Sequence, residues 1–158
     1  MNIFFLDPVP GVCASYHCDQ HVVKMVLETA QLLSTCHHVA GTAKPAMYKQ
    51  THTNHPCAVW VRQSRANYLW AYELLSKLCE EFETRRGKEH KTAGLLPVLS
   101  KPPNLPDGKV TEPPMCLPDQ YKSGSVCDSY RRYYNGEKSK FANYKWGRAA
   151  PSWFKDAS

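Results

Sequence analysis

Apolar residues recur at helical spacing in two long stretches of the chain. In the first, from about Cys13 to His38, they follow one another at intervals of three and four residues, and Gly41 and Pro45 end the stretch. This pattern predicts one long and heavily buried helix. Its apolar stripe consists of Val22, Met25, Val26, Thr29, Leu32 and Leu33, widened by Val23, Leu27 and Ala30.

The second stretch predicts a helix from Pro56 to about Arg86, because proline is common at the first helical position and Gly87 supplies a stop. Asn54 or His55 is expected to lie near its cap. The side chains expected to face the core are Trp60, Ser64, Asn67, Ala71, Leu75, Leu78 and Phe82. Those expected to face solvent are Glu73, Lys77, Glu80 and Thr84.

Outside these stretches the pattern is less regular. Residues 1–7 form a short apolar segment, typical of a strand or an extended lead-in. The prolines of residues 97–118 exclude a regular helix or a central strand, so this stretch is either a functional loop or a strap around the helices. A third helix is expected to start near Asp128. The pattern predicts a mainly α fold, with residues 1–158 in a single compact domain of three principal helices and a long Pro-rich irregular segment.

Composition narrows the class of protein. No apolar run is long enough to span a bilayer, and the first residues lack the features of a signal peptide, so we expect a cytoplasmic protein. The seven cysteines include no Cys-x-x-Cys pair, which argues against a disulfide framework. The absence of a glycine-rich phosphate loop and of a Gly-x-Ser-x-Gly turn excludes nucleotide-dependent enzymes and serine hydrolases. We expect no cofactor.

The net charge of +6 is concentrated late in the chain, between residues 130 and 155, where lysines and arginines alternate with aromatic residues. Basic groups neutralise phosphates, and aromatic rings stack on exposed bases. The segment therefore indicates a nucleic-acid interface, or alternatively a C-terminal helix and tail whose aromatic side chains fill the core.

One face of the first predicted helix carries unusual chemistry. Six polar residues fall within an arc of roughly 80°, namely His17, His21, Lys24, Glu28, Gln31 and Thr35. These are residue types that move protons or form Schiff bases, and a carboxylate beside an amine is the pairing that imine formation requires. The alternative is a solvated or partly buried polar stripe.

Two further clusters are candidates for binding. His52, Asn54 and His55 lie just before a predicted helix N-terminus, where main-chain N–H groups attract anions such as phosphate, unless they serve only as a cap.

Cys13, His17 and His21 have a spacing that can bind zinc. However, the sequence offers no His-Glu-x-x-His motif and no clear fourth ligand, so we expect no metal site.

The segment Asp19-Gln20-His21, followed seven residues later by Glu28, resembles the phage-type pyrimidine-dimer DNA glycosylases, also called endonuclease V. The helix after His55, with its basic end before Gly87, and the aromatic, basic C-terminal region are similar to that family more weakly.

The resemblance implies a compact α domain that excises a damaged pyrimidine and then cleaves the strand at the abasic site. In that family the N-terminal α-amine attacks the sugar C1′ to give an imine, and a glutamate at the position of Glu28 assists. The family exposes a small residue after loss of the initiator methionine. Here Asn2 follows, before which methionine is usually retained, so the nucleophile would be the amine of Met1 or that of Lys24.

The sequence thus predicts a DNA glycosylase and abasic-site lyase for damaged or modified pyrimidines. Glu28 would be the general acid/base, and His17 and His21 would orient the site or contact the sugar-phosphate. Trp146 would fill the space left by a flipped base. The residues expected to contact phosphates are Arg62, Arg65, Arg131, Arg132, Lys138 and Lys140, besides the His52 cluster. DNA is the expected partner, with no membrane and no nucleotide cofactor.

Two alternatives stay open at this point. One is a non-catalytic nucleic-acid-binding protein, such as a virus-encoded one, whose binding would survive loss of Glu28. The other is a metalloenzyme built on Cys13, His17 and His21.

Overall fold

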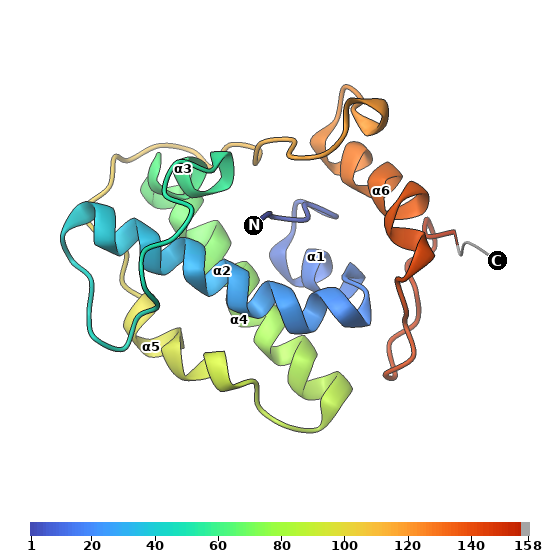
Figure 1. The fold of residues 1–158 in the computed structure, drawn as a ribbon, viewed down its shortest axis with the longest axis horizontal. Helices are drawn as coiled ribbons and strands as arrows, with labels where there is room; N and C mark the ends of the chain where they lie inside the picture. The colour runs from blue at the N-terminus through green and yellow to red at the C-terminus, as the bar shows by residue number, and fades with distance from the viewer. Residues whose placement is uncertain (156–158) are drawn as a thin grey trace.

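The regular structure of the chain is helical throughout residues 1–155, which are the residues that the computed structural model describes. Two long helices, α2 (Asp19–Ala40) and α4 (Arg65–Arg86), pack against each other at the centre of the molecule (Figure 1). The short helix α1 (Pro10–Tyr16) precedes α2, and α3 (Pro56–Arg62) precedes α4. The predicted mainly α fold is confirmed.

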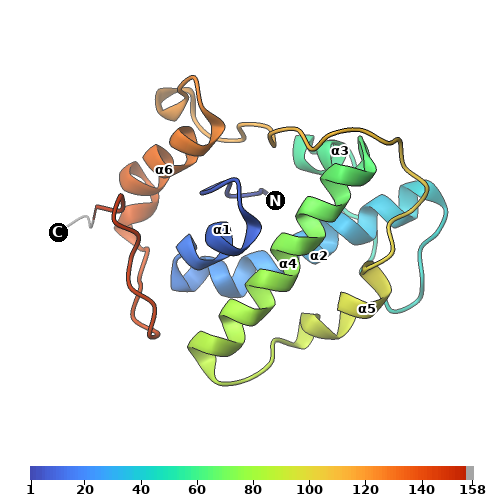
Figure 2. The ribbon, with the colours of Figure 1, turned by 180° about the vertical axis from the view of Figure 1, so that it is seen from behind.

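The second half of the chain is less regular. After α4 come a 3₁₀ turn η1 (Lys91–Leu95) and the short helix α5 (Leu96–Leu99). A long connection then passes outside α3 and leads through η2 (Asp119–Tyr121) to α6 (Val126–Gly136) and η3 (Lys138–Lys140) (Figure 2). None of the helices within residues 1–155 is long and apolar enough to cross a membrane.

The first predicted long helix is in fact two helices, so the prediction was wrong at its start. The backbone of His17 and Cys18 is extended, with ψ angles of 137° and 162°. The imidazole of His17 donates from Nδ1 to the carbonyl oxygen of Cys13, in the last turn of α1. Because both helices turn an apolar face to the same core, the apolar spacing continues across the break.

The second predicted helix is also broken, at Gln63 and Ser64. Ser64 has extended φ and ψ angles of −155° and 159°, and its hydroxyl accepts a hydrogen bond from the main-chain N–H of Asn67. This is an N-cap, which the Ser-x-x-Asn sequence signals locally. His55 caps α3 as expected, by accepting from the N–H of Cys57.

The predicted core is largely correct. The residues expected to face the core on the second stretch, from Trp60 to Phe82, are buried. On α2 the stripe is narrower than expected, because Val23 and Leu27 are 38% and 39% exposed. Gly41 and Gly87 end α2 and α4 in the left-handed conformation, with φ angles of 74° and 69°.

The Pro-rich segment behaves as a strap, although its first residues are helical in α5, contrary to expectation. Its main chain bonds to α4, where Pro106 accepts from the N–H of Arg65 and Thr111 donates to the side chain of Asn67. The third predicted helix, α6, starts slightly earlier than predicted, because its N-cap is Ser125 and not Asp128. Residues 1–7 form no strand, and residues 3–6 are buried in the core.

Candidate active site

Glu28 is the carboxylate on which two amines converge. The α-amine of Met1 lies 3.0 Å from its Oε1, and Nζ of Lys24 lies 3.7 Å from its Oε2. The Glu28 side chain is only 10% exposed, whereas that of Lys24 is 69% exposed. No group within residues 1–155 hydrogen-bonds Oε2. A buried carboxylate therefore contacts the α-amine through Oε1 and keeps Oε2 without a hydrogen bond.

The N-terminal segment, residues 1–7, brings this amine to the middle of α2. The Phe4 ring stacks on the imidazole of His21, with ring centroids 4.2 Å apart, and Met1 reaches Glu28. Three residues of extended chain span about 10 Å, and the seven helical residues from His21 to Glu28 rise by about the same distance. The N-terminus lies near the middle of the molecule in both ribbon views (Figures 1 and 2).

Asn2, the residue that follows Met1, is held by contacts with α6 and the strap. Its Oδ1 accepts from the hydroxyl of Tyr130 on α6 at 2.9 Å, and its Nδ2 donates to the carbonyl of Cys116 on the strap at 3.0 Å. Asn2 was not predicted as a site residue, because its partners lie more than a hundred residues away along the chain. No local signal could have revealed it.

The two predicted histidines are buried and neutral. Burial lowers the pKa of His17 to about 4 and that of His21 to about 2. His17 is fully enclosed, which is incompatible with direct contact to a sugar-phosphate, and it caps the C-terminus of α1 and does not lie on the face of α2. Nδ1 of His21 shares a hydrogen bond of 2.6 Å with the hydroxyl of Tyr134. These positions favour the orienting role for both residues.

Asp19 and Gln20, the other residues of the Asp-Gln-His segment, attach the C-terminal region to the start of α2. The carbonyl of Asn143 accepts from the N–H of Asp19, and the Gln20 side chain accepts from the N–H of Asn143. Oδ2 of Asp19 accepts from the N–H of Lys145 at 2.6 Å. This motif therefore has a structural role as well as supplying His21.

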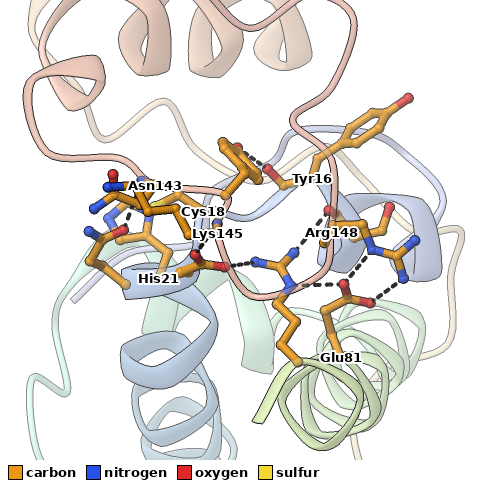
Figure 3. A network of polar contacts seen from close by, with 12 residues as sticks. Tyr16, Cys18, His21, Glu81, Asn143, Lys145 and Arg148 are labelled. Atoms are coloured by element: carbon orange, nitrogen blue, oxygen red, sulfur yellow. Dashed lines mark hydrogen bonds and ion pairs between the residues drawn. The ribbon is translucent and has the colours of Figure 1, made fainter. Parts of the chain in front are cut away.

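A buried ion network reinforces the same attachment (Figure 3). Arg85 on α4 pairs with Asp19 at 3.0 Å and with Glu81 at 2.9 Å. Glu81 also accepts two hydrogen bonds from Arg148, at 2.6 and 3.0 Å. Although burial opposes ionisation, the two guanidinium groups together lower the pKa of Glu81. The network joins α2, α4 and the C-terminal segment.

The predicted cluster before the second long helix lies near the site. His52 and Asn54 are exposed, and His52 has a positive φ of 48°. His55 is half-buried, and its pKa is lowered by burial and then by the charge of the N-terminal amine. The Met1–Glu28 pair and His55 therefore share one electrostatic environment.

Some of the predicted phosphate contacts are engaged within the protein. Arg131 donates to the carbonyl of Leu6 and pairs with Asp7 at 3.2 Å, and Arg62 donates to the carbonyl of Thr53. Both are tied to loops, so their first role is structural.

The other predicted basic residues are more available. Arg65, Arg132 and Lys140 are exposed. Lys138 is half-buried, with Nζ 5.8 Å from the centre of the Phe4 ring. Trp146 packs against the guanidinium of Arg86, at 4.3 Å. Trp146 follows Lys145, whose main-chain N–H binds Asp19, the first residue of α2. Along α2, Glu28 lies about 14 Å from Asp19.

The ligand atoms of Cys13, His17 and His21 do not converge. Within residues 1–155, the one group of three or more potential ligands that does converge is His55, Cys57 and Cys116, whose ligand atoms lie within 4.8 Å of one another. The hydrogen bond between the two thiols lowers the pKa of Cys116 and raises that of Cys57. Sequence spacing could not identify this group, because Cys116 comes from the strap.

Comparison with known proteins bears on the family of this chain. A family model described as pyrimidine dimer DNA glycosylase matches residues 1–94. No curated protein matches the chain, and no solved structure does. The matched residues include the Met1–Glu28 pair, His55 and the whole of α4. Since they form more than half of the chain, this protein belongs to the pyrimidine dimer DNA glycosylase family.

Proposed function

We propose that this protein excises damaged pyrimidines from DNA and then cleaves the strand at the resulting abasic site. The α-amine of Met1 is the nucleophile, and Glu28 is the general acid/base. The observation that carries the proposal is the contact of 3.0 Å between this amine and a buried carboxylate oxygen. A nucleophile and its base within hydrogen-bond reach are the usual signature of covalent catalysis.

The reaction follows from this pair. Glu28 takes a proton from the α-ammonium group, and the free amine then attacks the sugar C1′. The bond from C1′ to the base breaks, and the base leaves with the electron pair and gains a proton. Loss of the second amine proton and opening of the sugar ring give an imine. The imine acidifies the C2′ proton, and its removal expels the 3′-phosphate oxygen and breaks the strand.

The distances of the two amines from Glu28 favour Met1 over Lys24 as the nucleophile. The Met1 α-amine lies 3.0 Å from Oε1 of Glu28, whose carboxylate is buried. There, electrostatic interactions are stronger than in water. Lys24 projects into solvent beside the same carboxylate, a position suited to a phosphate contact. The exposed groups of His52, Asn54, Arg65, Arg132 and Lys140 would provide further DNA contacts, with Lys138.

The test is borohydride trapping on DNA with an abasic site. Borohydride reduces an imine to a stable amine, so we expect a covalent protein–DNA adduct whose peptide map places the link at Met1. Since the nucleophile in this proposal is Met1, we expect the Lys24→Ala variant to form the adduct as well. DNA binding without an adduct would favour a non-catalytic nucleic-acid-binding protein, and an adduct at Lys24 would reassign the nucleophile.

A further inference from the structure

Three metal-binding side chains meet where the strap passes the start of α3. His55 is the N-cap of that helix, Cys57 lies in its first turn, and Cys116 comes from the strap. The two sulfur atoms lie 3.9 Å apart, and one ligand atom from each of the three residues lies within 4.8 Å of the others. Two segments of the chain that are about sixty residues apart thus place soft ligands around one point.

The spacing of the sulfur atoms fits a shared metal ion. Zinc binds cysteine sulfur at about 2.3 Å in tetrahedral geometry, which places two such sulfurs about 3.8 Å apart. A disulfide would require an S–S distance of about 2.05 Å. The observed 3.9 Å agrees with the first arrangement.

We propose that His55, Cys57 and Cys116 bind one thiophilic divalent cation, for which Zn²⁺ is the best match. Two thiols and an imidazole are a ligand set that selects zinc over calcium or magnesium. On binding, each thiol releases one proton, and the two thiolates neutralise the charge of the ion. A water molecule completes the four-coordinate site.

The surrounding contacts orient two of the ligands. Asn2 holds the carbonyl of Cys116 through Nδ2 at 3.0 Å, while its Oδ1 lies 3.8 Å from the sulfur of Cys57. Nδ1 of His55 accepts a hydrogen bond from the N–H of Cys57. A neutral imidazole has one nitrogen with a free lone pair and one that carries a proton. Nδ1 therefore loses this hydrogen bond whether it binds the metal itself or carries the proton while Nε2 binds. One coordinate bond to zinc outweighs one such hydrogen bond, so the exchange favours the ion.

The ion would join three parts of the protein. It would tie the strap to α3, and through Asn2 it would tie both to the N-terminal segment that carries the α-amine. We expect the ion to stabilise the fold, which distinguishes it from the metalloenzyme alternative built on Cys13, His17 and His21.

The test measures metal content directly and does not depend on activity. The full chain is expressed with zinc in the medium, purified without chelator, and analysed for Zn²⁺ per chain and for thiols. We expect one ion per chain in the wild type, and a thiolate-to-metal absorption band when Co²⁺ replaces it. Cys116→Ser is expected to abolish both. Cys127→Ser is the matched control, since Cys127 is also half-buried and lies outside the group.

Chelation provides a second measurement that needs no variant to fold. We expect EDTA to lower the melting temperature of the wild type and to leave that of Cys116→Ser unchanged. Reduced protein that binds no stoichiometric Zn²⁺ or Co²⁺ would overturn the proposal. The same conclusion would follow if the ion persisted in Cys116→Ser, or if the purified protein had lost two hydrogens to a disulfide between Cys57 and Cys116.

Discussion

At the scale of single residues, Glu28 combines two properties that are rarely found in one carboxylate. It is buried, and one of its oxygens has no hydrogen-bond partner among residues 1–155. Buried polar atoms are normally satisfied, and those that are not often have a catalytic purpose. The other oxygen, Oε1, lies 3.0 Å from the α-amine, and this contact is the reason we assign proton transfer to Glu28.

Replacing Glu28 by glutamine tests that assignment. Glutamine keeps the shape and can still accept a hydrogen bond from the amine, but it cannot take a proton. We expect the rate of borohydride trapping to fall about 100-fold or more, with little change in melting temperature. Glu80→Gln makes the same chemical change at an exposed carboxylate and should have no effect. An unchanged trapping rate in Glu28→Gln would contradict the role of Glu28.

The buried histidines predict how stability depends on pH. Because burial lowers the pKa of His17 to about 4 and that of His21 to about 2, the folded protein keeps both neutral below pH 6. The unfolded chain protonates them near pH 6.5, so it binds more protons than the folded state, and stability falls as the pH decreases. Each histidine is expected to remove roughly 1–2 kcal/mol between pH 7 and pH 5.

Urea unfolding at several pH values measures this effect. In His21→Phe, which keeps an aromatic ring against Phe4 but does not titrate, the loss of stability between pH 7 and pH 5 should be smaller. Equal pH dependence in the two proteins would show that His21 titrates normally in the folded state.

At the scale of elements, the start of α2 holds the C-terminal segment. Asp19 accepts hydrogen bonds from Arg85 on α4 and from the N–H of Lys145, and Gln20 binds Phe141 and Asn143. Because these partners are main-chain groups or a buried arginine, the attachment depends on the carboxylate and amide of two neighbouring residues. This arrangement positions the aromatic and basic region that is expected to meet DNA.

Asp19→Asn is expected to weaken this attachment. The substitution removes the charge that balances Arg85, although Glu81 still pairs with that arginine. We expect a loss of about 2–4 kcal/mol in the free energy of unfolding, and faster trypsin cleavage after Lys145 and Arg148. The matched control is Asp119→Asn, since Asp119 is 94% exposed in its pair with Lys122 and should contribute little. If cleavage rates do not change, the network does not hold the segment.

At the scale of the whole molecule, the fold brings the chain end to the middle of a helix. The first residues pack in the core between the long helices and α6, and Tyr130 and the strap hold Asn2. The α-amine therefore reaches Glu28 with a fixed geometry, and its position depends on the whole fold. Reactions of this kind lose about 100-fold in rate when a reacting group is misplaced by 1 Å.

Adding Gly-Ser before Met1 should remove the activity without unfolding the protein. Each added residue moves the amine by about 3.5 Å, and the carboxylate loses its partner. We expect adduct formation to fall at least about 100-fold, while DNA binding is retained. The same two residues placed after the last residue are the control. Trapping that survives the N-terminal addition would point to Lys24.

The helices were predictable because their signals are local. The apolar spacing, Gly41, Gly87 and the His55 cap gave the main boundaries correctly. The two breaks, at His17 and at Ser64, were missed because the apolar stripe continues through them. The exposure of Val23 and Leu27 could not be predicted, because it depends on which part of α2 the other helices cover.

The sequence by itself determined the helical class, the pairing of Lys24 with Glu28 one turn apart, and the resemblance that the family model supports. It could not determine that the α-amine of Met1 meets Glu28, or that Cys116 joins His55 and Cys57. Helix periodicity relates residues a few positions apart, whereas these contacts join extended segments to helices across long distances in the chain. Only the packing of the whole core brings such groups together.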